Sequence, residues 1–174
     1  MGAFCRELGP FVASLDGVGL GENHKFTLKI TDDTSPHKTA AFGTAAKDEY
    51  FTGRNITGEG LLTETTLAQF TAVMPSTTVT GSELMIASPV GTSLKSLAGK
   101  LVLKPVVGGV TSVTASEWIT LFNAAFKVDM EIVADAETDR EYKCMFTAFP
   151  ADSVPSGETY EIGDIGAFGY GETS

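Results

Sequence analysis

Residues 141–149 read EYKCMFTAF, and the alternation in this stretch decides the fold. Alternating side chains fall on opposite faces of an extended strand. One face carries Tyr142, Cys144, Phe146 and Ala148. Met145 and Phe149 lie on the other face, which predicts that both faces of this strand are covered.

The same two-residue period recurs along the chain. Residues 24–31 read HKFTLKIT, in which apolar and polar residues alternate. Further strands are predicted at 54–62, 83–88, 100–107, 118–122 and 126–134. Within the first of these, Gly58 and Gly60 indicate a bulge or a close backbone approach. About eight short strands with regular turn signals predict a mainly β fold, an antiparallel β-sandwich or barrel.

One segment has the pattern of a helix. Thr66-Leu67-Ala68-Gln69 matches a capping box, in which Thr66 caps the first turn and Gln69 reaches back to it. The apolar residues that follow share one helical face, and Pro75 ends the element. We therefore expect one short flanking α-helix around 66–75, which packing must stabilise because it is so short.

The chain reads as a single domain, 1–174, with a β core at 24–151. Residues 1–23 contain five glycines and predict a flexible N-terminal arm with one extended piece at 11–15. The turn signal Asp32-Asp33-Thr34-Ser35-Pro36 opens a long loop or hairpin, 32–53. A Gly-rich C-terminal extension occupies 152–174. Because both ends carry apolar residues, we expect these side chains to be buried on a neighbouring subunit.

Charge and hydropathy exclude several classes of protein. Twelve basic and 22 acidic residues among 174 give a net charge of −10 at pH 7, which argues against gripping a nucleic-acid backbone. The longest apolar runs fall far short of the roughly 20 residues that a membrane helix needs. The first residues lack the basic and apolar regions of a signal peptide. We therefore expect a protein made and folded in a cytoplasm.

The sequence contains few of the residue patterns that usually form catalytic or metal-binding sites. His24 and His37 have no His or Cys at a metal-ligand spacing. Asp135, Glu137 and Asp139 alternate in a turn, but the glycine and distal glutamate of a calcium loop are missing. No catalytic or phosphate-binding signature stands in its required context. The sequence predicts no enzyme activity, no metal and no cofactor.

Two cysteines, Cys5 and Cys144, lie far apart in the sequence. Cys5 falls in the predicted arm and Cys144 in the apolar strand. We expect two reduced thiols, one exposed and one buried, with no disulfide framework.

Three stretches, which together cover about half of the chain, follow one another in a characteristic order. HKFTLKITDDTSP, 24–36, is an opening strand and turn, and a long loop leads from it to Tyr50-Phe51-Thr52-Gly53. ITGEGLLTETTLAQFTAVMP, 56–75, is a strand that runs into a short helix through a Thr/Glu cap. FKVDMEIVADAETDREYKCMFTAFPA, 126–151, is a late hairpin that ends in an aromatic–Pro step. In these features the chain resembles phage tail tube proteins.

The resemblance implies a structural virion protein whose subunits form hexameric rings that stack into a hollow tail tube. Its partners would be copies of itself and other tail proteins, assembled in the host cytoplasm without membrane insertion. Loop 32–53 and arm 1–23 would reach the adjacent ring. DNA would pass through the tube without specific binding, and an acidic lumen would repel its phosphates. The candidate lumen-facing residues are Glu59, Asp129 and Glu131.

Other functions fit the same acidic, strand-rich character. A capsid decoration or head-tail connector protein would form trimers or one closed ring, whereas a head-to-tail interface polymerises. A carbohydrate-binding β-sandwich would present Tyr50, Phe51 and Trp118 as an aromatic platform.

Overall fold

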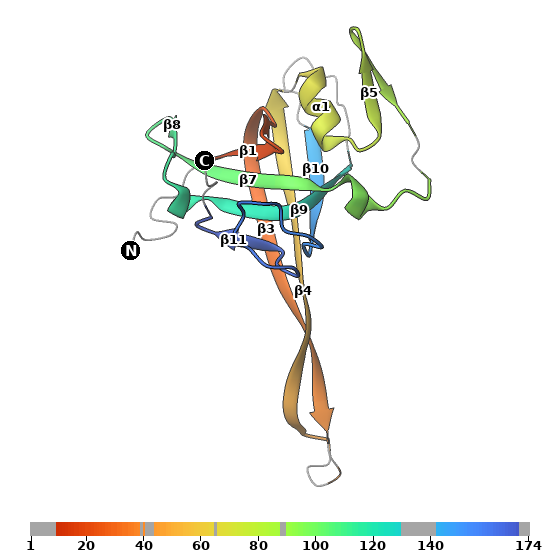
Figure 1. The fold of residues 1–174 in the computed structure, drawn as a ribbon, viewed down its shortest axis with the longest axis vertical. Helices are drawn as coiled ribbons and strands as arrows, with labels where there is room; N and C mark the ends of the chain where they lie inside the picture. Colours follow the sequence, from red (N-terminus) through yellow and green to blue (C-terminus); the bar gives the residue numbers. More distant parts are fainter. Residues whose placement is uncertain are drawn as a thin grey trace, which may run out of the picture.

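The computed structural model describes residues 10–38, 40, 44–64, 66–87, 90–129 and 142–170. Within them the protein is mainly β, with one large antiparallel sheet, one small hairpin and one short α-helix (Figure 1), so the predicted fold class is confirmed. The strands are β1 (Phe11–Leu15), β2 (Val18–Gly19), β3 (Glu22–Lys38), β4 (Ala46–Glu64), β5 (Thr77–Thr80), β6 (Glu83–Ile86), β7 (Gly99–Val107), β8 (Val110–Thr111), β9 (Ile119–Val128), β10 (Tyr142–Phe149) and β11 (Gly166–Phe168). The helices are α1 (Leu67–Val73) and two 3-10 turns, η2 (Leu94–Leu97) and η3 (Ala115–Glu117).

The large sheet curls around one core. Its strand order is β2-β1-β7-β9-β10-β4-β3, while β8 pairs with β7 and β11 pairs with β9. β1 also lies close to β3, so the two ends of the sheet approach each other across the core. β5 and β6 form a separate hairpin beside α1 (Figure 1).

β9 joins the two halves of this curled sheet. Its first residues pair with β7 and β11, and its later residues pair with β10. The register between β7 and β9 shifts between the pairs Leu101–Leu121 and Gly99–Ala124, so β9 carries one extra residue there. Such a bulge bends a strand, and here it lets β9 pass from one half of the sheet to the other.

Two strands were expected where β9 runs, at 118–122 and 126–134. This expectation is wrong, because residues 119–128 form a single bent strand. The intervening Asn123-Ala124-Ala125 stays in the ladder, paired with β10. Residues 130–134 lie outside the described residues.

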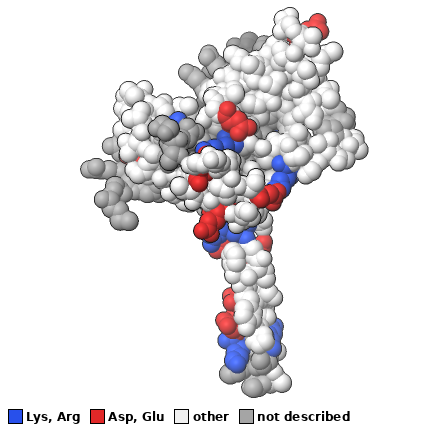
Figure 2. Space-filling view, in the orientation of Figure 1, with Lys and Arg blue, Asp and Glu red and all other residues white. Residues whose placement is uncertain are grey.

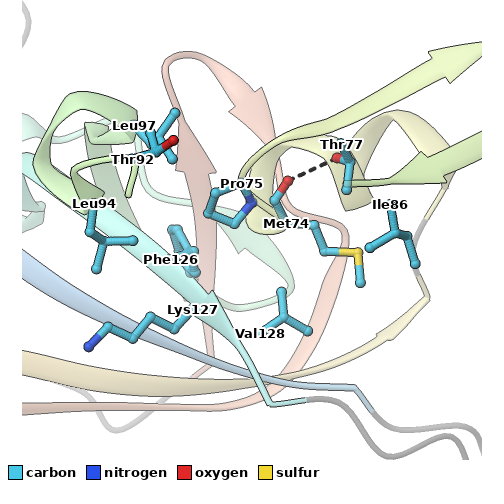
Figure 3. A pocket seen from close by; sticks show the side chains of 10 residues that line it. All are labelled: Met74, Pro75, Thr77, Ile86, Thr92, Leu94, Leu97, Phe126, Lys127 and Val128. Atoms are coloured by element: carbon cyan, nitrogen blue, oxygen red, sulfur yellow. Dashed lines mark hydrogen bonds between the residues drawn. The ribbon is translucent and has the colours of Figure 1, made fainter. Parts of the chain in front are cut away.

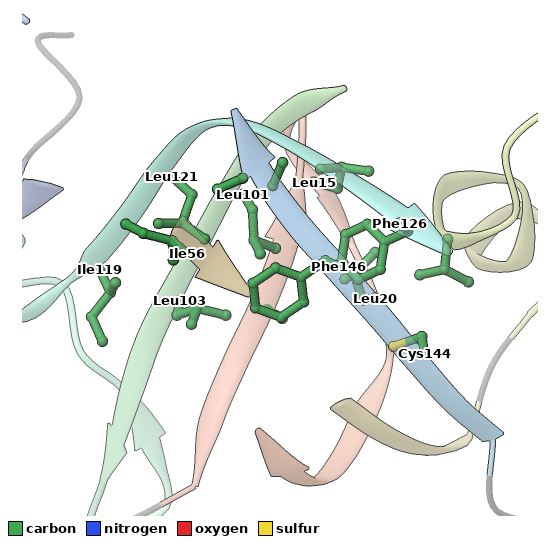
Figure 4. Close-up of a cluster of buried hydrophobic side chains, with 14 of the residues drawn as sticks. Leu15, Leu20, Ile56, Leu101, Leu103, Ile119, Leu121, Phe126, Cys144 and Phe146 are labelled. Carbon is green, nitrogen blue, oxygen red and sulfur yellow. The ribbon is translucent and has the colours of Figure 1, made fainter. Parts of the chain in front are cut away.

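Apolar side chains from both halves of the sheet fill the core (Figure 4). The bulkiest fully buried apolar residues are Leu20, Leu62, Leu101, Leu103, Leu121, Phe126 and Phe146. The Phe146 ring lies 5.5 Å from the Phe126 ring and 5.9 Å from the Phe26 ring, measured between centroids. Gly58 and Gly60 face Phe146 and Phe26 across the ladders, which confirms the predicted close backbone approach.

The expected helix is confirmed together with its cap. The Thr66 Oγ1 accepts a hydrogen bond from the Gln69 backbone N–H at 3.4 Å, and the Gln69 Oε1 accepts one from the Thr66 N–H at 2.6 Å. The Phe70 ring meets the Tyr142 ring edge-on, with centroids 5.0 Å apart. Packing against the sheet thus stabilises a helix of seven residues.

The extended piece predicted at 11–15 is confirmed as β1, but the flexible arm predicted around it is wrong for the residues that the structure describes. β1 pairs with β7 along its whole length, and the side chains of Ala13, Leu15 and Leu20 are buried. The nearby glycines serve a turn instead of an arm, since Gly17 adopts a positive φ of 80° between β1 and β2. Residues 1–9, including Cys5, lie outside the described residues.

Of the two alternatives predicted for 32–53, a long loop or a hairpin, the hairpin is confirmed. β3 continues to Lys38 and β4 begins at Ala46, so most of this segment is a β-hairpin. Pro36 is tolerated because β3 is the last strand of the sheet, where a missing N–H breaks no inner ladder. The turn predicted at 32–36 does not form, because the polar side chains of this stretch have partners on the facing strand.

The described part of the C-terminal extension folds back onto the sheet of its own chain. β11 pairs with β9, and the Tyr160 ring stacks on Phe122 with centroids 3.9 Å apart. Ile165 packs against the core. The expected burial of this extension on a neighbouring subunit is therefore wrong for Tyr160 and Ile165, whereas Ile162 is 72% exposed.

Candidate assembly and binding surfaces

A two-stranded ribbon projects from the curled sheet (Figure 1). It consists of residues 32–38 of β3 and 46–53 of β4, and nearly all of its residues are exposed on both faces. Seven extended residues span roughly 20 Å, so the ribbon reaches well beyond the core. An isolated two-stranded hairpin is marginally stable in water. The ribbon therefore has the character of an element that a partner covers.

Polar pairs fasten the base of the ribbon. The Arg54 guanidinium donates two hydrogen bonds to the Asp32 carboxylate, at 2.6 and 2.9 Å, and the Asn55 amide donates one to Asp33 at 2.5 Å. The bonds from Arg54 lower the pKa of Asp32, because they stabilise its charged form. Acidic and basic residues gather where the ribbon meets the body (Figure 2).

Two aromatic side chains stand on the ribbon. Tyr50 is 56% exposed and Phe51 is 60% exposed. Tyr50 meets the His37 ring edge-on at 5.6 Å, while the Arg54 guanidinium lies over Phe51 at 5.7 Å. Exposed aromatic rings on a protruding element are typical anchors of protein–protein contacts.

Trp118 does not join these two aromatic residues. Its indole N–H donates a hydrogen bond to the Ser112 carbonyl at 3.0 Å, and the Lys104 ammonium lies 3.9 Å above its ring. Trp118 precedes β9 in the body, whereas Tyr50 and Phe51 are consecutive residues of the ribbon. The expected platform of these three aromatic residues is therefore not assembled within one chain.

An apolar groove lies near the other end of the molecule, between α1, β6, η2 and the end of β9 (Figure 3). Its volume is about 330 Å³. Met74, Ile86, Leu94 and Phe126 are among its lining residues. Ile86 is 71% exposed, and neighbouring Val90 is 91% exposed. Exposed apolar side chains next to a groove are typical of a contact surface.

The outward face of β3, β4, β10 and β9 carries a group of lysines and threonines. We call it the lysine–threonine face, and it comprises Lys25, Thr27, Lys29, Thr57, Glu59, Leu61, Lys127, Lys143, Met145 and Thr147. Seven of these residues line a shallow depression of about 410 Å³. Met145 lines this open depression, and both Met145 and Phe149 are half-buried, so the second face of β10 is only partly covered by the described residues.

The candidate lumen residues differ in their surroundings. Glu59 lies on the lysine–threonine face, where its carboxylate forms an ion pair with the Lys143 ammonium at 3.0 Å. Asp129 is exposed directly after β9. Glu131 lies outside the described residues. Glu59 thus lies on this face and Asp129 lies two residues beyond Lys127 of the same face, while the grouping of all three carboxylates stays a prediction.

The described residues contain no group of His, Cys, Asp and Glu suited to a metal ion. Cys144 is 2% exposed, its thiol donates to the Gly60 carbonyl at 3.4 Å, and burial raises its pKa to about 11. None of the helices in the described part of the chain has the length and apolar character to cross a bilayer.

No family model matches this chain, and no curated protein matches its sequence.

Proposed function

We propose that this protein is a structural virion component that assembles into hexameric rings, stacked as a hollow tail tube through which DNA passes. Its partners are further copies of the chain and other tail proteins. The proposal joins the resemblance of three sequence stretches to the shape of the subunit.

The ribbon is the observation that carries the proposal. It is exposed on both faces, bears Tyr50 and Phe51, and has no covering element among the described residues. A neighbouring subunit would bury these side chains and stabilise the hairpin. The family resemblance assigns this segment to the contact between rings.

The position of the ribbon supports an open-ended assembly. The ribbon and the end that carries α1 and β5 lie at opposite ends of the molecule (Figure 1). A contact between two different surfaces of identical subunits is head-to-tail, and it continues indefinitely unless a rotation closes it. Stacked rings require such a contact along the tube.

The edge of the sheet supports a second contact, within the ring. β3 ends the strand order and has no ladder partner on its outer edge in the described part of the chain. An open edge strand readily pairs with another chain. Pairing around a ring would remove these edges.

The test is negative-stain electron microscopy of the purified chain over a concentration series. We expect hollow tubes or stacked rings from the wild type and their loss in the double variant Tyr50→Ser/Phe51→Ser. Val113→Ser is the matched control, because Val113 is 89% exposed but lies away from the ribbon. Size-exclusion chromatography with light scattering would give the mass of the smaller species.

Two outcomes would contradict the proposal. Tubes that form equally well from the ribbon variant would show that the ribbon does not join subunits. Closed trimers or single rings at every concentration would instead indicate a decoration or connector protein.

A further inference from the structure

The lysine–threonine face has a local charge opposite to that of the whole chain. Its four lysines, Lys25, Lys29, Lys127 and Lys143, outnumber the described carboxylates on or next to the face, Glu59 and Asp129. The whole chain has a net charge of −10. A partner that this face attracts must therefore be an anion, because charge complementarity selects the partner locally.

The Glu59 carboxylate already forms an ion pair. Lys143 approaches Glu59 to 3.0 Å, and both side chains are close to half exposed. Lys25, Lys29 and Lys127 are exposed to solvent. Three ammonium groups are thus available to an anion beyond the ion pair on the face.

The remaining polar side chains fit phosphate oxygens. Thr27, Thr57 and Thr147 line the depression of about 410 Å³ together with Lys29 and Lys127. Threonine hydroxyls and lysine ammonium groups are among the usual donors to the phosphates of a nucleic-acid backbone. A carboxylate-bearing partner would use the ammonium groups but has less need of three hydroxyl donors.

The layout of the donors suits an extended polymer. Lys25 and Lys29 are four residues apart on β3, roughly 13 Å along the strand. Lys127 lies on β9, three strands away across the sheet, roughly 14 Å from β3. Charges distributed at this scale over an open, shallow surface match a chain of phosphates better than one small anion.

We propose that the lysine–threonine face makes sequence-independent contacts with the phosphate backbone of DNA. The choice of DNA rests on the proposed function, whereas the phosphate chemistry rests on the face itself. A few lysine–phosphate contacts are weak and screened by salt, and they let a protein slide along DNA. Contacts of this kind guide passing DNA without holding it. An entirely acidic lumen would repel DNA at the position of Glu59, whereas these lysine contacts attract it weakly there.

Fluorescence anisotropy with a labelled 20-base-pair duplex of mixed sequence tests the proposal on the full chain. We expect weak binding at 25 mM salt, with a slope of log affinity against log salt of about −2 to −3. Lys29→Glu/Lys127→Glu should lower the affinity at least about tenfold. Lys29→Ala/Lys127→Ala should make the slope less negative by about 2, because two phosphate contacts are lost.

A matched control separates this face from net charge. Lys95→Glu/Lys104→Glu changes the net charge by the same amount, but it alters lysines on η2 and β7. It should keep the affinity within about twofold. Urea unfolding of each variant would verify that its fold is intact.

The proposal is overturned by any of three results. They are the absence of binding by the wild type at 25 mM salt, unchanged binding by the face variant, and equal losses in the face and control variants. If the wild type binds no DNA and the face variant alters the oligomeric mass, the face is a contact between copies. Tube formation is scored separately by electron microscopy, so tubes that bind no DNA would overturn this inference and leave the proposed function standing.

Discussion

The ring of Phe146 lies directly over the backbone of Gly58 on the neighbouring strand. A Cβ placed on Gly58 would be 2.3 Å from the Phe146 Cζ and 2.4 Å from the Thr27 carbonyl oxygen. Neither distance is possible for real atoms, and the Thr27 oxygen belongs to the backbone of β3. The core of this curled sheet therefore requires a residue without a side chain at this position.

Gly58→Ala should lower the free energy of unfolding by about 1–3 kcal/mol, the usual cost of forcing extra volume into a packed core. Gly53→Ala is the control, since no atom lies within 4 Å of the corresponding position on the ribbon. That change should be neutral or should stabilise by up to about 1 kcal/mol, because alanine restricts the unfolded chain. Urea midpoints measure both effects, and equal midpoints for the two variants would contradict the packing argument.

Arg54→Ala should loosen the ribbon without unfolding the core. Arg54 holds Asp32 by two hydrogen bonds at the ribbon's base, and both side chains are about half exposed. Limited proteolysis should therefore cut the ribbon faster in this variant, while the thermal midpoint of the whole protein changes little. Lys47→Ala removes a charge near the tip of the ribbon, and the protease should cut the ribbon of this variant at the wild-type rate. A lower thermal midpoint with unchanged cutting would contradict this assignment.

The ion pair between Asp32 and Arg54 also predicts that the stability of the ribbon depends on pH in the acidic range. The pKa of Asp32 is lower in the folded protein than in the unfolded chain, so its contribution is present above the unfolded pKa. It is lost as the pH falls through the lowered, folded pKa. Proteolysis of the wild-type ribbon by an acid-active protease should therefore approach that of Arg54→Ala only at acidic pH.

The sequence was sufficient for those elements whose signals are local. Strand β10 follows from alternation within nine residues, and α1 follows from a capping box that spans four. Both signals depend on neighbours along the chain. The hairpin at 32–53 could not be told from a loop, because Asp32 and Asp33 are typical turn residues and their partners lie 22 residues further on.

The lysine–threonine face depends even more on residues that lie far apart in the sequence. Its lysines come from β3, β9 and β10, and they share a surface only once the strand register is known. Glu59 could be selected from the sequence as an outward carboxylate, but its partner Lys143 is 84 residues away. The net charge of the chain is negative, but the local charge of this face is positive, because a net charge does not show how the charged residues are distributed.

Burial of Cys144 predicts a second dependence on pH, at the alkaline end. Its pKa rises from a usual value of 9.0 to about 11, because the apolar core disfavours the thiolate. Below pH 9 the thiol is neutral in both states, and this contribution is fully present. As the pH rises from 9 to 11 the unfolded chain loses the proton first, so stability falls, by on the order of 2 kcal/mol at pH 11.

Unfolding measured from pH 8 to 10.5 checks this in a Cys5→Ser background, compared with the same chain carrying Cys144→Ala. The alanine variant should be less stable at pH 8, because it leaves a small cavity, but it should lose less stability as the pH rises. In the native state Cys144 should react with a thiol reagent only as fast as the protein opens. Rapid labelling under native conditions would contradict the burial of this side chain.

Tyr160 should be the residue that fastens the C-terminal segment to β9. Its ring stacks on Phe122 at 3.9 Å with an interplanar angle of 15°, and Tyr170 meets the same Phe122 ring edge-on at 5.3 Å. Loss of the stacked ring removes both the aromatic contact and part of the apolar burial. Tyr160→Ala should therefore lower the free energy of unfolding by about 1–3 kcal/mol.

Two further variants show whether the stack itself is responsible. Tyr160→Phe keeps the ring and should recover most of the stability, while Ile162→Ala changes a 72% exposed residue of the same segment and should have little effect. Proteolysis after Pro155 should accelerate only in Tyr160→Ala, because the segment then detaches while the sheet stays folded. Equal losses in the alanine and phenylalanine variants would assign the stability to the hydroxyl instead of the ring, and an unchanged alanine variant would show that β11 alone holds the segment.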